Sequence, residues 1–159
     1  MTTIGVLHPG QMGVSVAASA RAGGHTVLWA SEGRSSQTAG RAAQYGLEDA
    51  GTLAELCRRA EIILSVCPPH AAEAVAQSVA AQGFTGIYVD ANAIAPQRAQ
   101  AVAAIVMQRG ASFVDGGIIG NPAWKPSTTW LYLSGPQAES VAACFAAGPL
   151  ETEVIGDAI

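Results

Sequence analysis

Short apolar segments alternate with alanine-rich segments along almost the whole chain, and this alternation is the strongest constraint on its fold. Apolar runs bounded by turn residues are typical of strands, whereas alanine-rich stretches with an apolar face are typical of helices. The run EIILSVC at 61–67 is almost continuously apolar, as expected for a strand buried on both faces of a parallel sheet. The pattern therefore predicts one doubly wound, mostly parallel α/β sheet, formed by residues 1–159 as a single domain.

Turn and cap residues set the expected limits of each element. The pattern predicts strands at 3–7, 26–30, 61–67, 86–90, 112–116, 129–135 and 152–156, and helices at 11–22, 36–44, 52–60, 70–82, 96–110 and 137–147. Gly23 or Gly24 suits a left-handed cap at the end of the first helix. Thr52 suits the start of the third helix, and Pro96 suits the first turn of the fifth.

Composition and charge exclude several kinds of partner. Half of the 159 residues are apolar and the net charge is −4, which argues against binding to nucleic acid or to an anionic membrane. No stretch approaches the ~18 apolar residues that a membrane span requires, and no leader precedes the first strand, so we expect a cytoplasmic protein. Cys57, Cys67 and Cys144 have neither CxxC nor zinc-binding spacing, so we expect free thiols and no metal.

The segment between the first strand and the first helix carries a glycine pattern. A dinucleotide-binding turn reads G-x-G-x-x-G, and Gly10 and Gly13 occupy its second and third glycine positions. Gly10 lets the backbone approach a pyrophosphate, and the amides of Gln11 and Met12 are the expected donors at the helix start. These residues predict a Rossmann-type dinucleotide-binding domain; the alternative is a turn that uses glycine only for close packing.

His8 occupies the first glycine position of this pattern, and Pro9 follows it. A residue before proline favours extended backbone geometry. His8 is therefore expected to be extended, and the turn can still form provided that His8 needs no positive φ angle.

The end of the second strand bears on the choice of dinucleotide. An Asp or Glu there would hold the adenosine ribose of NAD, but this chain has Ser31 at the expected position. Arg34, Ser35 and Ser36 follow, and they suit a 2′-phosphate as charge and hydroxyl donors. The loop therefore favours NADP, while Glu32 leaves NAD open if the strand runs one residue longer.

Four segments in the same order make the chain resemble the β-hydroxyacid dehydrogenase superfamily, which includes 6-phosphogluconate dehydrogenase and hydroxyisobutyrate dehydrogenase. The first is the turn HPGQMG, which matches the family pattern G-x-G-x-M-G except at His8. The others are SVCPP, similar to a Leu-Pro beside the cofactor; DANAIAP, similar to D-x-S-T-x-x-P; and DGGIIGN, similar to D-A-P-V-S-G-G. The resemblance covers essentially the whole chain.

The resemblance implies binding roles for several residues in these segments. Those beside the cofactor are Cys67, Pro68 and Asn92, and those at the substrate are Asn92, Ile119, Gly120 and Asn121. Asn92 and Ile119 stand where the family has serine, and Asn121 stands at the last glycine. Asp90 and Asp115 end strands, where aspartate usually binds loop amides rather than acting as acid and base.

The activity that the resemblance implies is hydride transfer between a nicotinamide and a small hydroxy acid or a related carbonyl or imine. In the family a lysine in a helical carboxy-terminal domain acts as acid and base, and that domain also forms a homodimer. Lys125, the single lysine of this chain, matches no family motif. We therefore expect only the cofactor-binding part here, with Trp124 and Trp130 facing the helical domain. The alternative is a non-catalytic nicotinamide-dinucleotide-binding or redox-sensing module.

Overall fold

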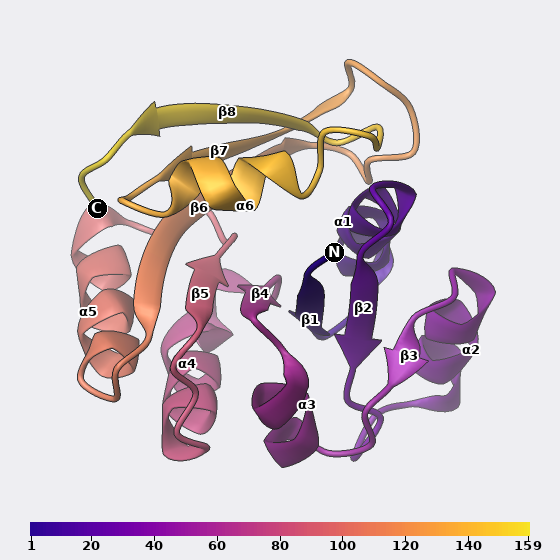
Figure 1. The fold of residues 1–159 in the computed structure, drawn as a ribbon, viewed down its shortest axis with the longest axis horizontal. Coiled ribbons are helices and arrows are strands. Elements are labelled where there is room, and N and C mark those ends of the chain that lie inside the picture. Colours follow the sequence, from indigo (N-terminus) through magenta and orange to yellow (C-terminus); the bar gives the residue numbers. More distant parts are fainter.

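The computed structural model describes residues 1–159 and contains one eight-stranded sheet with helices packed against both faces (Figure 1). The strands are β1 (Thr3–Leu7), β2 (Thr26–Trp29), β3 (Glu48–Asp49), β4 (Ile62–Ser65), β5 (Ile87–Asp90), β6 (Ser112–Gly120), β7 (Thr129–Ser134) and β8 (Glu151–Gly156). The α-helices are α1 (Gln11–Ala22), α2 (Ser36–Gln44), α3 (Leu53–Arg59), α4 (Ala72–Ala81), α5 (Pro96–Met107) and α6 (Ala138–Ala143), with a 3₁₀ turn, η1 (Pro69–Ala71), before α4. None of these helices combines the length and the apolar character needed to cross a bilayer.

The strand order β3-β2-β1-β4-β5-β6-β7-β8 confirms the predicted doubly wound sheet. All neighbouring strands are parallel except β6 and β7, which are antiparallel. The chain builds outward from β1 in one direction and from β4 in the other. Ligands of such sheets bind at the carboxyl ends of the strands, beside the point where this order reverses. The topology therefore directs attention to the loops that follow β1, β2, β4 and β5.

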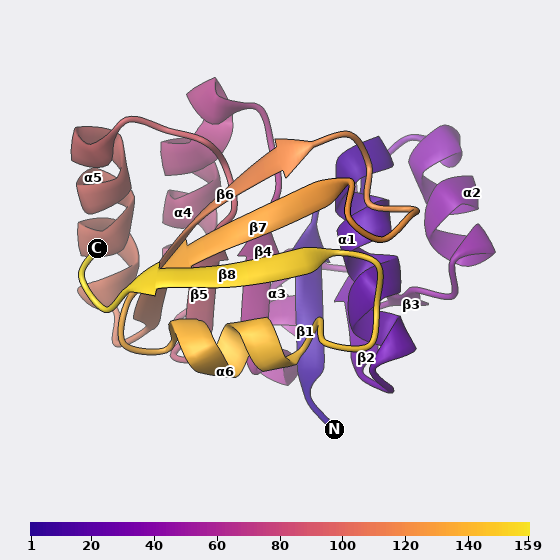
Figure 2. The same ribbon diagram turned by 90° about the horizontal axis from the view of Figure 1, so that it is seen from above.

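Two apolar clusters cover the two faces of the sheet. The larger cluster joins the sheet to α1 and α6, and the smaller joins it to α3, α4 and α5. Because side chains alternate along a strand, Ile62 and Leu64 of β4 enter the first cluster while Ile63 enters the second. Figure 2 shows β7 and β8 in front, with no helix over their outer face. The clusters hold the parallel strands rigidly under the ligand-binding edge.

Most predicted element limits agree with the structure to within a few residues. Thr52 caps α3 by accepting a hydrogen bond from the amide of Glu55, and Gly24 has φ +82 after α1. The sequence pattern missed β3, because two residues are too few to show a period. It also ended β6 four residues early, because the glycines after Asp115 look like a turn although they pair with β7.

The expectation for His8 is wrong: its φ is +62, in the left-handed region. Its carbonyl accepts a hydrogen bond from the amide of Gly10 at 2.6 Å. The same carbonyl lies so close to α1 that a Cβ on Gly13 would be 2.9 Å from it. The chain must turn sharply from β1 into α1 at this point, and this tertiary constraint overrides the extended preference that Pro9 imposes. His8 thus adopts the left-handed backbone conformation that glycine, the family residue at this position, adopts without steric cost.

A strained φ at His8 predicts a difference between two substitutions. His8→Gly removes the steric cost of the left-handed conformation, whereas His8→Ala removes the imidazole and keeps that cost. We expect the glycine variant to be more stable than the alanine variant by about 1 kcal/mol, measured by urea unfolding at neutral pH. Equal stability of the two variants would contradict the left-handed geometry.

Candidate functional site

The amino end of α1 is not capped by any side chain. Gly10 is its N-cap, and its first turn contains no acidic residue. The first amides of a helix lack intrahelical partners, and the helix dipole favours negative charge beside them. The amides of Gln11 and Met12 therefore lie where a phosphate group could accept hydrogen bonds.

The protein's own structure places different demands on the two glycines of the turn. Gly13 is required by packing, because a Cβ there would lie 2.9 Å from the carbonyl of His8. Gly10 has φ −69, which any residue can adopt, and the nearest atom to a Cβ would be 3.9 Å away. Neither conformation nor protein packing thus demands glycine at position 10. The space beside it fits the close approach of a ligand.

A cavity of about 340 Å³ opens beside this turn. Its wall comes from the starts of α1 and η1 and from the loop after β5. Of the thirteen lining residues, seven are among those predicted to bind the cofactor: Gly10, Gln11, Met12, Gly13, Cys67, Pro68 and Asn92. The others are His8, Val66, Pro69, Ala91, Ala93 and Ile118. Segments far apart in the sequence therefore meet at one hollow over the carboxyl edge of the sheet.

Asn92 joins two of these segments. Its Oδ1 accepts a hydrogen bond from the backbone amide of Cys67 at 2.8 Å, and its own backbone amide donates to Asp90 Oδ1 at 2.9 Å. Its Nδ2 lies 3.4 Å from Ser65 Oγ and from Cys67 Sγ. Asn92 is buried, with 6% of its surface exposed. Its side chain thus holds the β4 and β5 ends together as the floor of the cavity.

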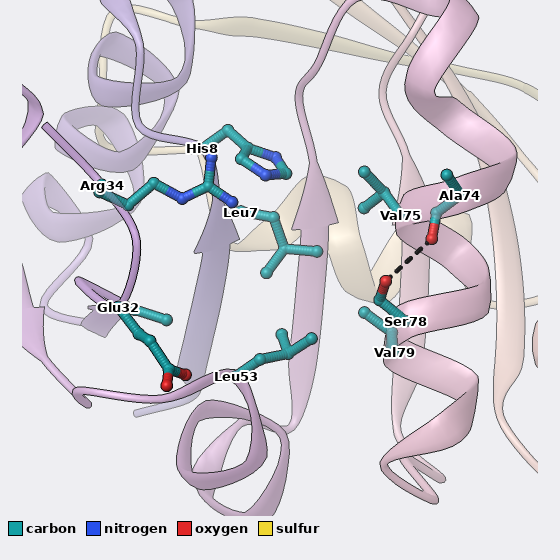
Figure 3. Close-up of a pocket in the computed structure, with 10 residues that line it drawn as sticks. Leu7, His8, Glu32, Arg34, Leu53, Ala74, Val75, Ser78 and Val79 are labelled. Atoms are coloured by element: carbon teal, nitrogen blue, oxygen red, sulfur yellow. Dashed lines mark hydrogen bonds between the residues drawn. The ribbon is translucent and has the colours of Figure 1, made fainter.

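A second cavity, of about 220 Å³, lies between the loop after β2 and helix α4. Its apolar residues are Leu7, Ala30, Leu53, Ala74, Val75 and Val79, and its polar residues are His8, Glu32, Arg34 and Ser78. Figure 3 shows the Arg34 side chain reaching toward the His8 ring, while Glu32 turns toward Leu53. Arg34 belongs to none of the ion pairs of the protein. The cavity offers an apolar slot with a free guanidinium at its His8 end.

Ser31 and Ser35, predicted to contact the cofactor, do not line this cavity. The amide of Ser31 donates to Asp49 Oδ1, which fixes the loop after β2. Ser35 caps α2, since its Oγ accepts from the amide of Thr38. No sequence pattern pointed to the α4 residues that form the opposite wall. Their place depends on how the β4–α4 connection crosses the sheet.

The predicted substrate residues divide into two groups. Asn92 and Ile119 line a third hollow together with Asp115, Tyr132 and Ile155. Gly120 and Asn121 lie outside it, with Gly120 paired to Thr129 in the β6–β7 ladder. The carbonyl of Asn121 accepts a hydrogen bond from Thr129 Oγ1.

Two carboxyl groups, the buried Asp90 and the half-buried Asp115, lie under the site on neighbouring strands. Asp90 is fully buried, and its Oδ2 has no hydrogen-bond partner. Burial raises the pKa of Asp90 to about 6; the charge of Asp115 adds to this, and the hydrogen bond from the Asn92 amide opposes it. Burial also raises the pKa of Asp115, which is the register partner of Asp90. Asp90 therefore positions the Asn92 turn at an electrostatic cost.

The β6–β7 loop packs back onto the first half of the chain. The Trp124 ring stacks on Tyr45 with centroids 4.6 Å apart, and the amide of Ala123 donates to Ser15 Oγ. Trp130 lies on β7 opposite Ile119. Lys125 is exposed in this loop and lines none of the three cavities. Trp124, still 43% exposed, thus has a partner within this chain.

The strand order and the uncapped glycine turn define a dinucleotide-binding domain of the Rossmann class. Residues 3–146 match the model of the NAD-binding domain of 6-phosphogluconate dehydrogenase. This chain belongs to that family, whose members include NAD(P)-dependent oxidoreductases. No curated protein matches the chain.

Solved structures share the fold over nearly the entire chain. The conserved protein MTH1747, described as similar to 3-hydroxyacid dehydrogenases, has 26% identity and a TM-score of 0.83, with 97% of this chain and 57% of that chain covered. A reductive aminase from Aspergillus terreus, in complex with NADPH and ethyl levulinate, has 22% identity and a TM-score of 0.80, with coverage of 99% and 55%. An imine reductase variant from Myxococcus stipitatus, in complex with NAD⁺, has 20% identity and a TM-score of 0.78, with coverage of 98% and 55%. The chain thus spans little more than half the length of these proteins.

The distinct demands on Gly10 and Gly13 predict opposite outcomes for two alanine variants. Gly13→Ala should lose about 2 kcal/mol of unfolding free energy, because its Cβ meets a fixed carbonyl. Gly10→Ala should lose about 1 kcal/mol or less, yet weaken NAD⁺ binding about tenfold or more. Urea unfolding and calorimetric titration measure the two effects. Normal NAD⁺ binding by Gly10→Ala would contradict a pyrophosphate site at the turn.

The raised pKa of Asp90 predicts a pH-dependent stability. Because the folded pKa of about 6 exceeds the unfolded value of about 3.9, its contribution is fully present below about pH 4 and is lost as the pH rises through about 6. Asp90→Asn keeps an acceptor for the backbone amide of Asn92 and cannot ionise, so the variant does not lose stability in this way as the pH rises. The stability of the variant relative to the unsubstituted protein should rise by about 2–3 kcal/mol between about pH 4 and pH 7. A constant difference in urea unfolding would contradict it.

Proposed function

We propose that this chain binds NADP in the groove formed by the two cavities and presents the nicotinamide for hydride transfer. The proposal is carried by the unpaired guanidinium of Arg34, which lies in the cavity after β2 beside the uncapped start of α1. In a doubly wound sheet the adenosine lies after β2, the pyrophosphate at the first helix and the nicotinamide at the ends of the central strands. The cavity after β2, the start of α1 and the cavity beside Gly10 follow one another in the same order.

The adenosine end supports NADP over NAD, with NAD as the alternative. The apolar residues of the cavity, among them Leu53, Val75 and Val79, suit the adenine ring. Arg34 suits a 2′-phosphate, because a guanidinium donates several hydrogen bonds to phosphate oxygens and carries a full charge. Glu32 in the same cavity would accept hydrogen bonds from the ribose hydroxyls of NAD. Its negative charge disfavours a 2′-phosphate placed at its own end of the cavity.

The nicotinamide end is the cavity beside Gly10. We infer that Met12, Cys67 and Pro68 contact the nicotinamide riboside there, and that the amides of Gln11 and Met12 hold the pyrophosphate. Asn92 keeps this surface in place, because it accepts a hydrogen bond from the amide of Cys67 and donates one to Ser65 at the end of β4. The bound cofactor supplies the hydride, while these residues orient it and exclude water from one face.

The substrate end is the hollow that Asn92 and Ile119 share. We propose a small hydroxy acid or a related carbonyl or imine compound as the substrate. We also propose a helical carboxy-terminal domain as the source of the acid–base group and of a homodimer contact. The exposed side chains of Ile119 and Ile155 and the uncovered outer face of β7 and β8 support contact with such a domain (Figure 2).

The cofactor choice is tested by paired substitutions in the adenosine cavity. Arg34→Ala should weaken NADP⁺ binding about tenfold more than it weakens NAD⁺ binding, since only NADP⁺ carries the 2′-phosphate. Glu32→Ala should change the ratio in the opposite direction. Arg109→Ala, an exposed arginine after α5, is the matched control for loss of one positive charge. Calorimetric titration gives all the constants; equal losses of both dinucleotides in Arg34→Ala would overturn the 2′-phosphate assignment.

A further inference from the structure

His8 is the one residue that lines both the cavity after β2 and the cavity beside Gly10. A dinucleotide that fills both cavities must carry its pyrophosphate across their shared wall. The imidazole therefore lies at the crossing point, where the family pattern has a glycine without a side chain.

The backbone of His8 explains why the ring is there. At φ +62 its carbonyl points toward α1, where it bonds the Gly10 amide. The side chain then leaves the other side of the turn and enters the groove beside Arg34 (Figure 3). The Nδ1 atom is buried and has no hydrogen-bond partner, so the fold leaves bonding capacity of the ring unused.

We propose that His8 is a pyrophosphate-binding residue whose imidazole takes up a proton when the dinucleotide binds, so that affinity rises as the pH falls. This proposal rests on the proposed dinucleotide function and adds a proton-linked contact to it. A pyrophosphate carries two negative charges, and an imidazolium beside it gains a charge-assisted hydrogen bond that neutral imidazole lacks.

The surroundings of the ring favour the neutral form before the ligand arrives. Burial, and next the charge of Arg34, lower the pKa of His8 below its ordinary value. The pyrophosphate opposes the effect of Arg34, because its negative charge favours the protonated ring. Binding therefore shifts the proton equilibrium toward imidazolium.

Other charged groups face the ring from the elements around it. Glu32 lines the same cavity but turns away toward Leu53 (Figure 3), and Arg41 of α2 donates to the carbonyl of Pro9. In the cavity beside Gly10, burial raises the pKa of the Cys67 thiol, which keeps it protonated. Helix α4 contributes no ionisable side chain to the walls that His8 lines.

Asp90 also bears on the pH dependence of binding, because its pKa of about 6 lies in the relevant range. Its ionisation as the pH rises would add a negative charge beneath the cavity and would also weaken binding. The test must therefore separate His8 from Asp90.

The experiment is a calorimetric titration of the protein with NAD⁺ between about pH 6 and pH 8.5. NAD⁺ is the probe because the 2′-phosphate of NADP⁺ itself titrates with a pKa of about 6. We expect the affinity to rise about three- to tenfold on acidification, since one pKa unit corresponds to a factor of ten. Titrations in buffers of different ionisation enthalpy should show fractional proton uptake near the acid end.

Three variants locate the group responsible. His8→Gly restores the family residue and should retain only the smaller pH dependence of NAD⁺ binding that Asp90 contributes. Asp90→Asn should keep the pH dependence, as should His25→Gln, which changes a histidine that bonds the Thr2 amide at the opposite edge of the sheet. The same pH dependence in His8→Gly as in the unsubstituted protein, or none in the latter, would overturn the inference alone. Failure of every protein to bind either NAD⁺ or NADP⁺ at any pH would overturn the proposed function itself.

Discussion

The contact between the carbonyl of His8 and α1 determines the geometry of everything at the ligand-binding edge. It requires a residue without a side chain at position 13, and it forces His8 into the left-handed region. The same contact directs the start of α1, with its free amides, across the ends of β1 and β4. A strained residue at a ligand site is stable only when the surrounding structure determines it more strongly than local preference does. Here the packing of β1 and α1 in the larger apolar cluster provides that constraint.

Polar groups under the site form a second rigid unit. The strand register aligns Ser65, Asp90 and Asp115 across β4, β5 and β6. Asn92 connects this row to Cys67 through hydrogen bonds, so the cavity floor is held by side chains from segments distant in sequence. The cost is an unpaired oxygen on a fully buried carboxyl group. Such a cost in stability is common at functional sites, where side chains are held in place for binding at the expense of maximal stability.

The site could be predicted from sequence where the signal was local. The turn at 8–13 and the strand-end segments around Cys67 and Asn92 have short patterns, and the structure brings them to one cavity. Their binding role remains a prediction. Ser35 looked like a phosphate ligand because it follows β2, but a hydroxyl before a helix is equally suited to capping, and it caps α2. The α4 wall has no pattern of its own, since Val75 and Val79 also read as ordinary core residues of a helix.

Sequence alone determined the succession of strands and helices apart from β3, the position of the glycine turn and the parallel character of the central sheet, because each depends on periodicity or on residues adjacent in the chain. The tertiary structure decided the conformation of His8, the joining of two cavities by its ring and the pairing of β6 with β7. These features depend on how crossover connections place remote segments against each other. A proline favours an extended backbone in the residue before it, but the free energy of this preference is small compared with that of packing a helix on a sheet. The imidazole of His8 therefore lies in the groove for a reason that no local pattern contains.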